Sequence, residues 1–89
     1  MYTIEYKKAA LKILAKMPGH TVDLIRRKIR QLAKNPHAPN NNVIKMVVQG
    51  DNIYRLRVGD WRVIYKIDNG VLKILVLTIG PRGDVYKQL

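Results

Sequence analysis

The stretch from Tyr54 to Lys66 alternates apolar and charged residues with a period of two, and Gly59-Asp60 interrupts the alternation in its middle. This pattern predicts two antiparallel strands joined by a tight two-residue turn. The pairs expected across that turn are Val58 with Trp61, Arg57 with Arg62, Leu56 with Val63, Arg55 with Ile64 and Tyr54 with Tyr65. The hairpin therefore has two faces of opposite character, and the rest of the chain must cover one of them.

One face of this hairpin is apolar and is expected to face a core. Its residues are Tyr54, Leu56, Val58, Trp61, Val63 and Tyr65. The opposite face carries Arg55, Arg57, Arg62 and Lys66. Like charges directly opposite each other destabilise a strand pair, so placing Arg57 against Arg62 indicates a site built for an anion. The alternative is a solvated polar face, which suits a single arginine better than a cluster with no carboxylate on its face.

The charge of the whole chain supports an anionic partner. Seventeen Lys and Arg residues against six Asp and Glu give 89 residues a net charge of +11. Nucleic acid is the leading partner on this balance, followed by an acidic protein, with an anionic membrane surface a distant third. A chain of this length is expected to form one domain, residues 1–89.

Several classes of function are not expected from the composition. No cysteine is present, which excludes disulfides, a thiol nucleophile and a thiolate zinc site. We expect neither a cofactor nor a metal. The N-terminus lacks the pattern of a signal peptide, and no apolar stretch is long enough to span a bilayer, so we expect a cytoplasmic protein without a membrane partner.

The N-terminal part of the chain predicts a strand and two helices. Residues 2–6 alternate and predict a short strand, whereas residues from Lys7 to Pro18-Gly19 follow helical spacing. A second helix is expected from Thr21 to Lys34. The apolar stripes of these helices are Ala10, Ile13, Leu14 and Met17, then Val22, Ile25, Ile29 and Leu32. Residues 35–42 contain two prolines and four asparagines, which predicts a connecting loop.

The remaining strands surround the hairpin. Residues 43–48 are expected to form a strand that turns at residues 49–52, and residues 71–79 an inner strand that leaves the sheet at 80–83. Asn69-Gly70 predicts a two-residue type I′ turn. The pairs expected across it are Tyr65 with Ile74, Val63 with Val76 and Trp61 with Thr78. The predicted class is α+β: a short N-terminal strand, a helical hairpin, and an antiparallel sheet of three to four strands packed on the helices.

The chain resembles the RelE/ParE toxin superfamily, and within it the RelE-type ribosome-dependent mRNA interferases. The residues that carry this resemblance are Tyr54 to Lys66, Ile79-Gly80-Pro81-Arg82 and Val85-Tyr86. The resemblance implies a RelE-like fold, metal-independent cleavage of mRNA in the ribosomal A site, and neutralisation by a cognate antitoxin. The catalytic positions that it implies are Arg55, Arg57, Arg62, Arg82 and Tyr86.

The expected chemistry is attack of an RNA 2′-hydroxyl on the adjacent phosphate. On the resemblance, Arg57 and Arg62 hold the scissile phosphate and Arg55 orients the nucleophile or a neighbouring phosphate. Arg82 stabilises the leaving oxygen, and Tyr86 stacks on a base. Arginine stands where the best-known members have lysine, which weakens a general-base role at Arg55. The interval from Arg82 to Tyr86, which sets the placement of the tyrosine ring, is also slightly shorter than in those members. Because acid and base are both weak, we expect much of the in-line geometry to come from the ribosome, as the resemblance implies, and little activity on naked RNA.

Other interpretations of these residues remain open. The two histidines, His20 and His37, fall outside the sheet face, so a paired-histidine ribonuclease is not expected, and the loop around His37 is interpreted as a connector. Arg82 alternatively caps a turn, and Tyr86 alternatively closes the core. Candidate contacts to ribosomal or messenger RNA are Lys66, Arg26, Arg27 and Arg30. The charges of the second helix, which also include Lys28, are most simply a solvated face and alternatively hold ribosomal RNA phosphates.

Two functions from other classes compete with the nuclease. One is a ParE-like toxin that inhibits DNA gyrase with the same fold. The other is a non-catalytic basic module that binds nucleic acid, in which no single arginine is essential. For a toxin, we expect an acidic antitoxin segment to cross the sheet and contact or displace part of the arginine cluster.

Overall fold

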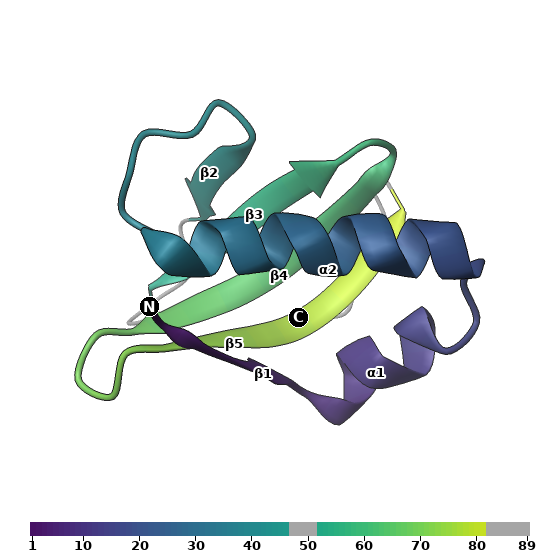
Figure 1. The fold of residues 1–89 in the computed structure, drawn as a ribbon, viewed down its shortest axis with the longest axis horizontal. Coiled ribbons are helices and arrows are strands. Elements are labelled where there is room, and N and C mark those ends of the chain that lie inside the picture. Colours follow the sequence, from purple (N-terminus) through teal and green to yellow (C-terminus); the bar gives the residue numbers. More distant parts are fainter. Residues whose placement is uncertain (47–51, 82–89) are drawn as a thin grey trace.

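The computed structural model describes residues 1–46 and 52–81. Its elements in chain order are β1 (Thr3–Tyr6), α1 (Lys8–Leu14), α2 (Gly19–Lys34), β2 (Val43–Met46), β3 (Ile53–Val58), β4 (Trp61–Asp68) and β5 (Lys73–Pro81). The long helix α2 crosses one face of the sheet (Figure 1). Helix α1 follows β1 and packs against β5 in the same core as α2. The α+β class predicted from the sequence is confirmed.

The two helices differ slightly from their predicted bounds. Helix α1 ends at Leu14, and residues 15–17 form a turn in place of its last predicted turn. Helix α2 begins at Gly19, two residues earlier than predicted, because Pro18 closes its first turn. The carbonyl oxygen of Pro18 accepts hydrogen bonds from the backbone N–H groups of Thr21 (3.0 Å) and Val22 (3.1 Å).

All five strands form one sheet in the order β1-β5-β4-β3-β2. Strand β1 pairs with β5 in parallel, with Thr3 opposite Lys73, while the other neighbours are antiparallel. The sheet is therefore mixed and has one strand more than the sequence predicted. The parallel pair joins the first and the last strand, and the chain between them, with both helices and strands β2 to β4, is long enough for the crossover that parallel pairing needs.

The central hairpin has the pairing that the sequence predicted. All five expected pairs between β3 and β4 are present, from Val58 with Trp61 to Tyr54 with Tyr65. Gly59 has φ +58° at the first turn position, a conformation that costs glycine little. Positive φ at this first position suits the twist of a two-residue hairpin.

The predicted register between β4 and β5 is wrong by two residues near the turn. Tyr65 lies opposite Val76, not Ile74, because residues 69–72 form a longer turn in place of a two-residue one. The Asp68 carboxylate stabilises that turn by accepting hydrogen bonds from the backbone N–H groups of Gly70 (3.0 Å) and Val71 (3.3 Å). A shift of two residues keeps each side chain on its face, so the predicted core residues stay in the core.

Farther along the same strand pair, an irregularity between Ile64 and Tyr65 shifts the register by one more residue. Trp61 consequently lies opposite Pro81. The prediction that the chain leaves the sheet at Gly80 is therefore wrong. Pro81 is tolerated because it is the last residue of β5, where its missing N–H matters least.

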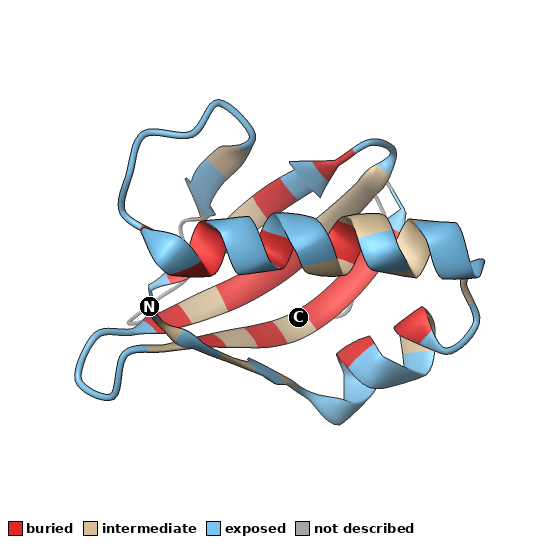
Figure 2. Ribbon diagram, viewed as in Figure 1, coloured by how far each residue is buried: buried red, intermediate tan, exposed pale blue. Residues whose placement is uncertain are grey.

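The main core lies between the helices and one face of the sheet (Figure 2). Helix α2 contributes Ile25, Ile29 and Leu32, which are the stripe predicted from its period. A second, smaller cluster on the far face was not anticipated. There Ile53 and Ile64 are buried, with Met46 and Leu77 packed against them, so the arginine-bearing face is apolar in part.

Tyr65 is completely buried, and its ring stacks on Tyr54 with centroids 5.6 Å apart. Its hydroxyl has no hydrogen-bond partner within residues 1–46 and 52–81, and burial raises the pKa of Tyr65. A buried hydroxyl without a partner costs about 1–3 kcal/mol. We therefore expect Tyr65→Phe to leave the free energy of unfolding unchanged or raise it by about 1 kcal/mol, measured by urea unfolding. A loss of stability above that size would contradict this expectation.

Candidate nucleic-acid interface

The three arginines of the central hairpin gather on the far face of the sheet. Arg55 and Arg57 project from β3, and Arg62 lies opposite Arg57 on β4. They line a small hollow of about 90 Å³. This arginine hollow consists of Asn41, Asn42, Ile44, Arg55, Arg57 and Arg62. No carboxylate is among these lining residues, so the hollow favours an anion.

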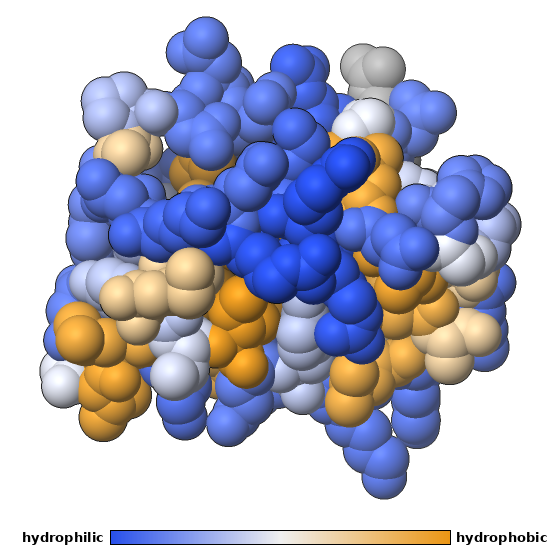
Figure 3. Space-filling view, viewed as in Figure 1, coloured by the Kyte–Doolittle hydropathy of each residue, from blue (hydrophilic) through white to orange (hydrophobic). Residues whose placement is uncertain are grey.

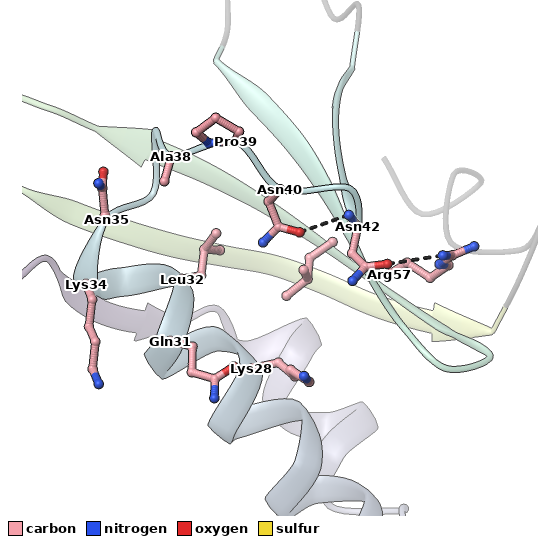
Figure 4. A pocket seen from close by; sticks show the side chains of 11 residues that line it. Lys28, Gln31, Leu32, Lys34, Asn35, Ala38, Pro39, Asn40, Asn42 and Arg57 are labelled. Atoms are coloured by element: carbon pink, nitrogen blue, oxygen red, sulfur yellow. Dashed lines mark hydrogen bonds between the residues drawn. The ribbon is translucent and has the colours of Figure 1, made fainter.

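Arg57 is the exposed member of the three and is held at the edge of the sheet by Asn42. Its Nη2 donates to Asn42 Oδ1 at 3.1 Å, and its backbone N–H donates to the Asn42 carbonyl at 2.8 Å. The backbone N–H of Asn42 in turn donates to Asn40 Oδ1 at 2.9 Å (Figure 4). The loop before β2 thus orients a guanidinium, a contribution beyond the connector that the sequence predicted.

Arg55 and Arg62 are half-buried. Arg62 folds over the hairpin turn, and its Nη1 donates to the carbonyls of Gly59 (3.1 Å) and Trp61 (3.1 Å). Arg55 lies between Ile44 of β2 and Ile64 of β4 in the pairing of the strands. These apolar neighbours limit the conformational freedom of the Arg55 side chain. Its charge interacts more strongly with an anion there than it would in open water.

Lys66 shares the far face but lies toward the other end of β4, opposite Ile53 and Leu75. It is half-buried and does not line the arginine hollow. The structure therefore separates Lys66 from the three arginines, although the sequence had placed all four on one face.

The predicted RNA-binding arginines of α2 do not join the arginine hollow. Arg26 lies over the ring of Tyr6, 4.7 Å from its centroid, on the β1 side of the helix. Burial raises the pKa of Tyr6, while the charges of Arg26 and Arg30 oppose this rise. Arg27 and Arg30 are exposed, and a hydrophilic band runs along this face of the molecule over α2 (Figure 3).

The opposite flank of α2 faces the hairpin and supplies Lys28, a cation that the sequence analysis had only grouped with the other charges of this helix. Lys28 lines an open hollow of about 490 Å³ next to the hairpin turn. This helix-side hollow consists of Leu24, Lys28, Asn42, Arg57, Val58, Gly59, Asp60 and Arg62. Successive residues of a helix are rotated by about 100°, so Lys28 points to the flank away from Arg26. Spacing along α2 separates the two flanks, but it does not say which of them faces the arginines.

A third hollow, of about 240 Å³, continues along the same flank between α2 and the loop at residues 35–42 (Figure 4). Its cations are Lys28, Lys34 and Arg57. The helix-side hollow and this third hollow therefore share Lys28, Asn42 and Arg57. The signal for Asn42 was present in the sequence, in the run of asparagines before β2, but it indicated only a turn.

The other predicted site residues have different outcomes. Arg82 and Tyr86 lie outside the described residues. His37 Nε2 is 2.8 Å from Asn69 Oδ1, an atom that also accepts a hydrogen bond from the Tyr2 hydroxyl at 2.9 Å, so this histidine lies away from the arginines in a contact between loop and turn.

Within residues 1–46 and 52–81, no three His, Asp or Glu side chains group closely enough to hold a metal ion. No helix in the described ranges has the length and apolar character needed to cross a membrane.

Comparison with known proteins assigns the chain to a protein family. Residues 4–86 match the family model described as the ParE toxin of type II toxin-antitoxin systems, parDE. The chain belongs to the RelE/ParE toxin superfamily. A curated relative, the putative toxin RelE1 of Methanocaldococcus jannaschii, is 29% identical over 86 residues, covering 97% of this chain and 96% of the relative.

Solved structures extend the comparison and indicate a RelE-type toxin. The archaeal RelE-RelB complex from Pyrococcus horikoshii matches with a TM-score of 0.79 and 31% identity, over 92% of this toxin and 96% of that chain. A mutant of the E. coli toxin RelE in the free state matches with a TM-score of 0.78 and 19% identity, over 98% and 92% of the two chains. The latter likeness concerns the fold alone. Together they confirm the RelE-like fold predicted from the sequence.

Proposed function

We propose that this RelE-type toxin is a ribosome-dependent mRNA endoribonuclease that works without a metal. The observation that carries the proposal is the like-charged pair Arg57 and Arg62, which lie opposite each other and share the arginine hollow with Arg55. Two guanidinium groups in such a pair repel each other until an anion lies between them. A phosphate matches the donor geometry of both groups.

The proposed chemistry is attack of a 2′-hydroxyl on the neighbouring phosphate, which leaves a 2′,3′-cyclic phosphate and a free 5′-hydroxyl. The added negative charge of the phosphorane is stabilised by Arg57 and Arg62, while Arg55 orients the nucleophile or a neighbouring phosphate. We assign Arg82 to the leaving oxygen and Tyr86 to stacking on a base, as the resemblance implies. Lys66 and the α2 arginines Arg26, Arg27 and Arg30 are proposed as contacts to RNA outside the reacting centre.

None of the three hairpin arginines is an effective proton acceptor near neutral pH, because a guanidinium stays protonated. The protein therefore supplies electrostatic stabilisation, and the in-line geometry of the RNA must come from its surroundings. In our proposal the ribosomal A site provides that geometry.

We also propose a cognate antitoxin as the inhibitory partner. The Pyrococcus horikoshii relative was solved as a RelE-RelB complex. The net charge of +11 of the toxin favours an acidic segment on the partner, and we expect this segment to contact or displace part of the arginine cluster. A toxin-antitoxin complex in which these arginines remain uncovered and unmoved would contradict this mode of inhibition.

The test of the nuclease is cleavage of one mRNA by purified toxin, with programmed ribosomes and with the same RNA alone, in the presence of a chelator. We expect cuts on ribosomes only, with cyclic phosphate ends that fail to form with Arg82→Ala. If a folded toxin cuts neither substrate and still arrests growth, the proposal fails. Inhibition of DNA gyrase supercoiling in a parallel assay would then point to the ParE-like activity.

A further inference from the structure

We propose that the helix-side hollow is a second phosphate subsite, in which Lys28 of α2 binds a nucleotide next to the scissile phosphate. This inference rests on the proposed action on RNA and adds to it a residue and a path for the strand. The hollow of about 490 Å³ has room for a nucleotide, whereas the arginine hollow of about 90 Å³ suits a single phosphate group.

The two hollows are continuous at three residues. Asn42, Arg57 and Arg62 line both of them. Strand β2 begins at Val43, opposite Leu56, and its pairing with β3 ends at the hydrogen bond from the Arg57 backbone N–H to the Asn42 carbonyl. Strand β2 does not extend beyond this bond to Val58, and an RNA backbone passing the sheet edge there stays beside Arg57 from one hollow to the other.

The charges in the helix-side hollow favour a phosphodiester. Among the described lining residues, Lys28, Arg57 and Arg62 contribute three cations against the one carboxylate of Asp60. Lys28 and Arg57 are exposed and make no ion pair with a carboxylate in the described part of the chain. Arg57 makes one side-chain hydrogen bond there, to Asn42, which leaves other donors of its fork for a phosphate.

The uncharged lining of this hollow also suits a sugar-phosphate backbone. None of its described lining residues is aromatic, whereas the Asn42 amide can donate to or accept from a 2′-hydroxyl. Contacts of this kind position a strand without reading its sequence. We therefore expect Lys28 to change affinity equally for RNAs of different sequence.

The test is equilibrium binding of a short 2′-O-methyl RNA, which cannot be cleaved, to the intact toxin across a range of salt concentrations. Lys28→Gln should raise the Kd about fivefold at low salt and lower the slope of log K against log salt by about 0.7. Asp60→Asn should tighten binding, because it removes the one carboxylate of the hollow. Lys12→Gln on α1 is the matched control for loss of one exposed lysine, and it should bind like wild type.

Other results would overturn this subsite. One is that Lys28→Gln binds RNA as strongly as wild type does. Another is that Lys28→Gln loses affinity for oligoglutamate but not for RNA, since that result assigns the hollow to an acidic peptide. Binding and cleavage are measured separately. If wild type cleaves mRNA on ribosomes and Lys28→Gln binds RNA like wild type, the subsite is refuted and the nuclease is not. If Lys28→Gln binds RNA more weakly but wild type does not cleave mRNA on ribosomes, the nuclease is refuted and the subsite is not.

Discussion

Arg57→Ala is expected to lower the rate of ribosome-dependent cleavage by about 10²-fold or more, the usual cost of removing one preorganised donor from a developing charge. The protein should remain folded, because Arg57 is exposed and its side chain makes one hydrogen bond among the described residues, to Asn42. Substitutions at such surface positions usually change the free energy of unfolding by no more than about 0.5 kcal/mol. The measurements are single-turnover cleavage on programmed ribosomes and thermal unfolding of the free toxin.

Lys12→Ala is the control for the loss of one positive charge. Lys12 is exposed on α1 and lines none of the three hollows at Arg57. Cleavage by this variant at the wild-type rate, beside a defect in Arg57→Ala, would assign the loss to position and not to net charge. Equal defects in both variants would favour a simple basic binding module, in which activity follows total charge.

Ile29→Ala should destabilise the toxin by about 3 kcal/mol, within the usual range for truncation of a buried isoleucine. Ile29 is 1% exposed and belongs to the core cluster between α2 and the sheet. Its removal leaves a cavity beneath the middle of the helix that carries Lys28. Urea unfolding of the variant and wild type gives the difference directly, and a loss below about 1 kcal/mol would mean that the core collapses to fill the space.

This destabilisation should weaken function only through the folded fraction. At temperatures where Ile29→Ala is still fully folded, we expect cleavage close to that of wild type. A cleavage defect in the folded variant would instead show that the position of α2 relative to the hairpin matters for activity.

The sequence predicted the central hairpin residue by residue because local rules determine it. The period of two assigns each side chain to a face, and a two-residue turn at Gly59-Asp60 leaves one register. The same rules placed Arg57 opposite Arg62, which is the pair at the centre of the candidate site. Local information was therefore sufficient for the part of the site within one hairpin.

Contacts between distant segments were not predictable in this way. The register of β4 with β5 depends on the Asp68 side chain, which stabilises a longer turn than Asn69-Gly70 favours alone. The placement of Lys28 beside Arg57 depends on which flank of α2 faces the open sheet edge, and helical periodicity does not contain that information. Arg82 and Tyr86 remain predictions because they lie outside the described residues.

The parallel pair of β1 with β5 has a consequence for the order in which the toxin folds. The side chain of Thr3 donates a hydrogen bond to the carbonyl of Leu72, 69 positions away along the chain. Contacts of such large sequence separation form late, because a long loop must close before they contribute stability. During synthesis, β1 has no strand to pair with until β5 has been made. The β3–β4 hairpin that carries Arg57 and Arg62 closes locally, so the basic surface assembles before the edge of the sheet is complete.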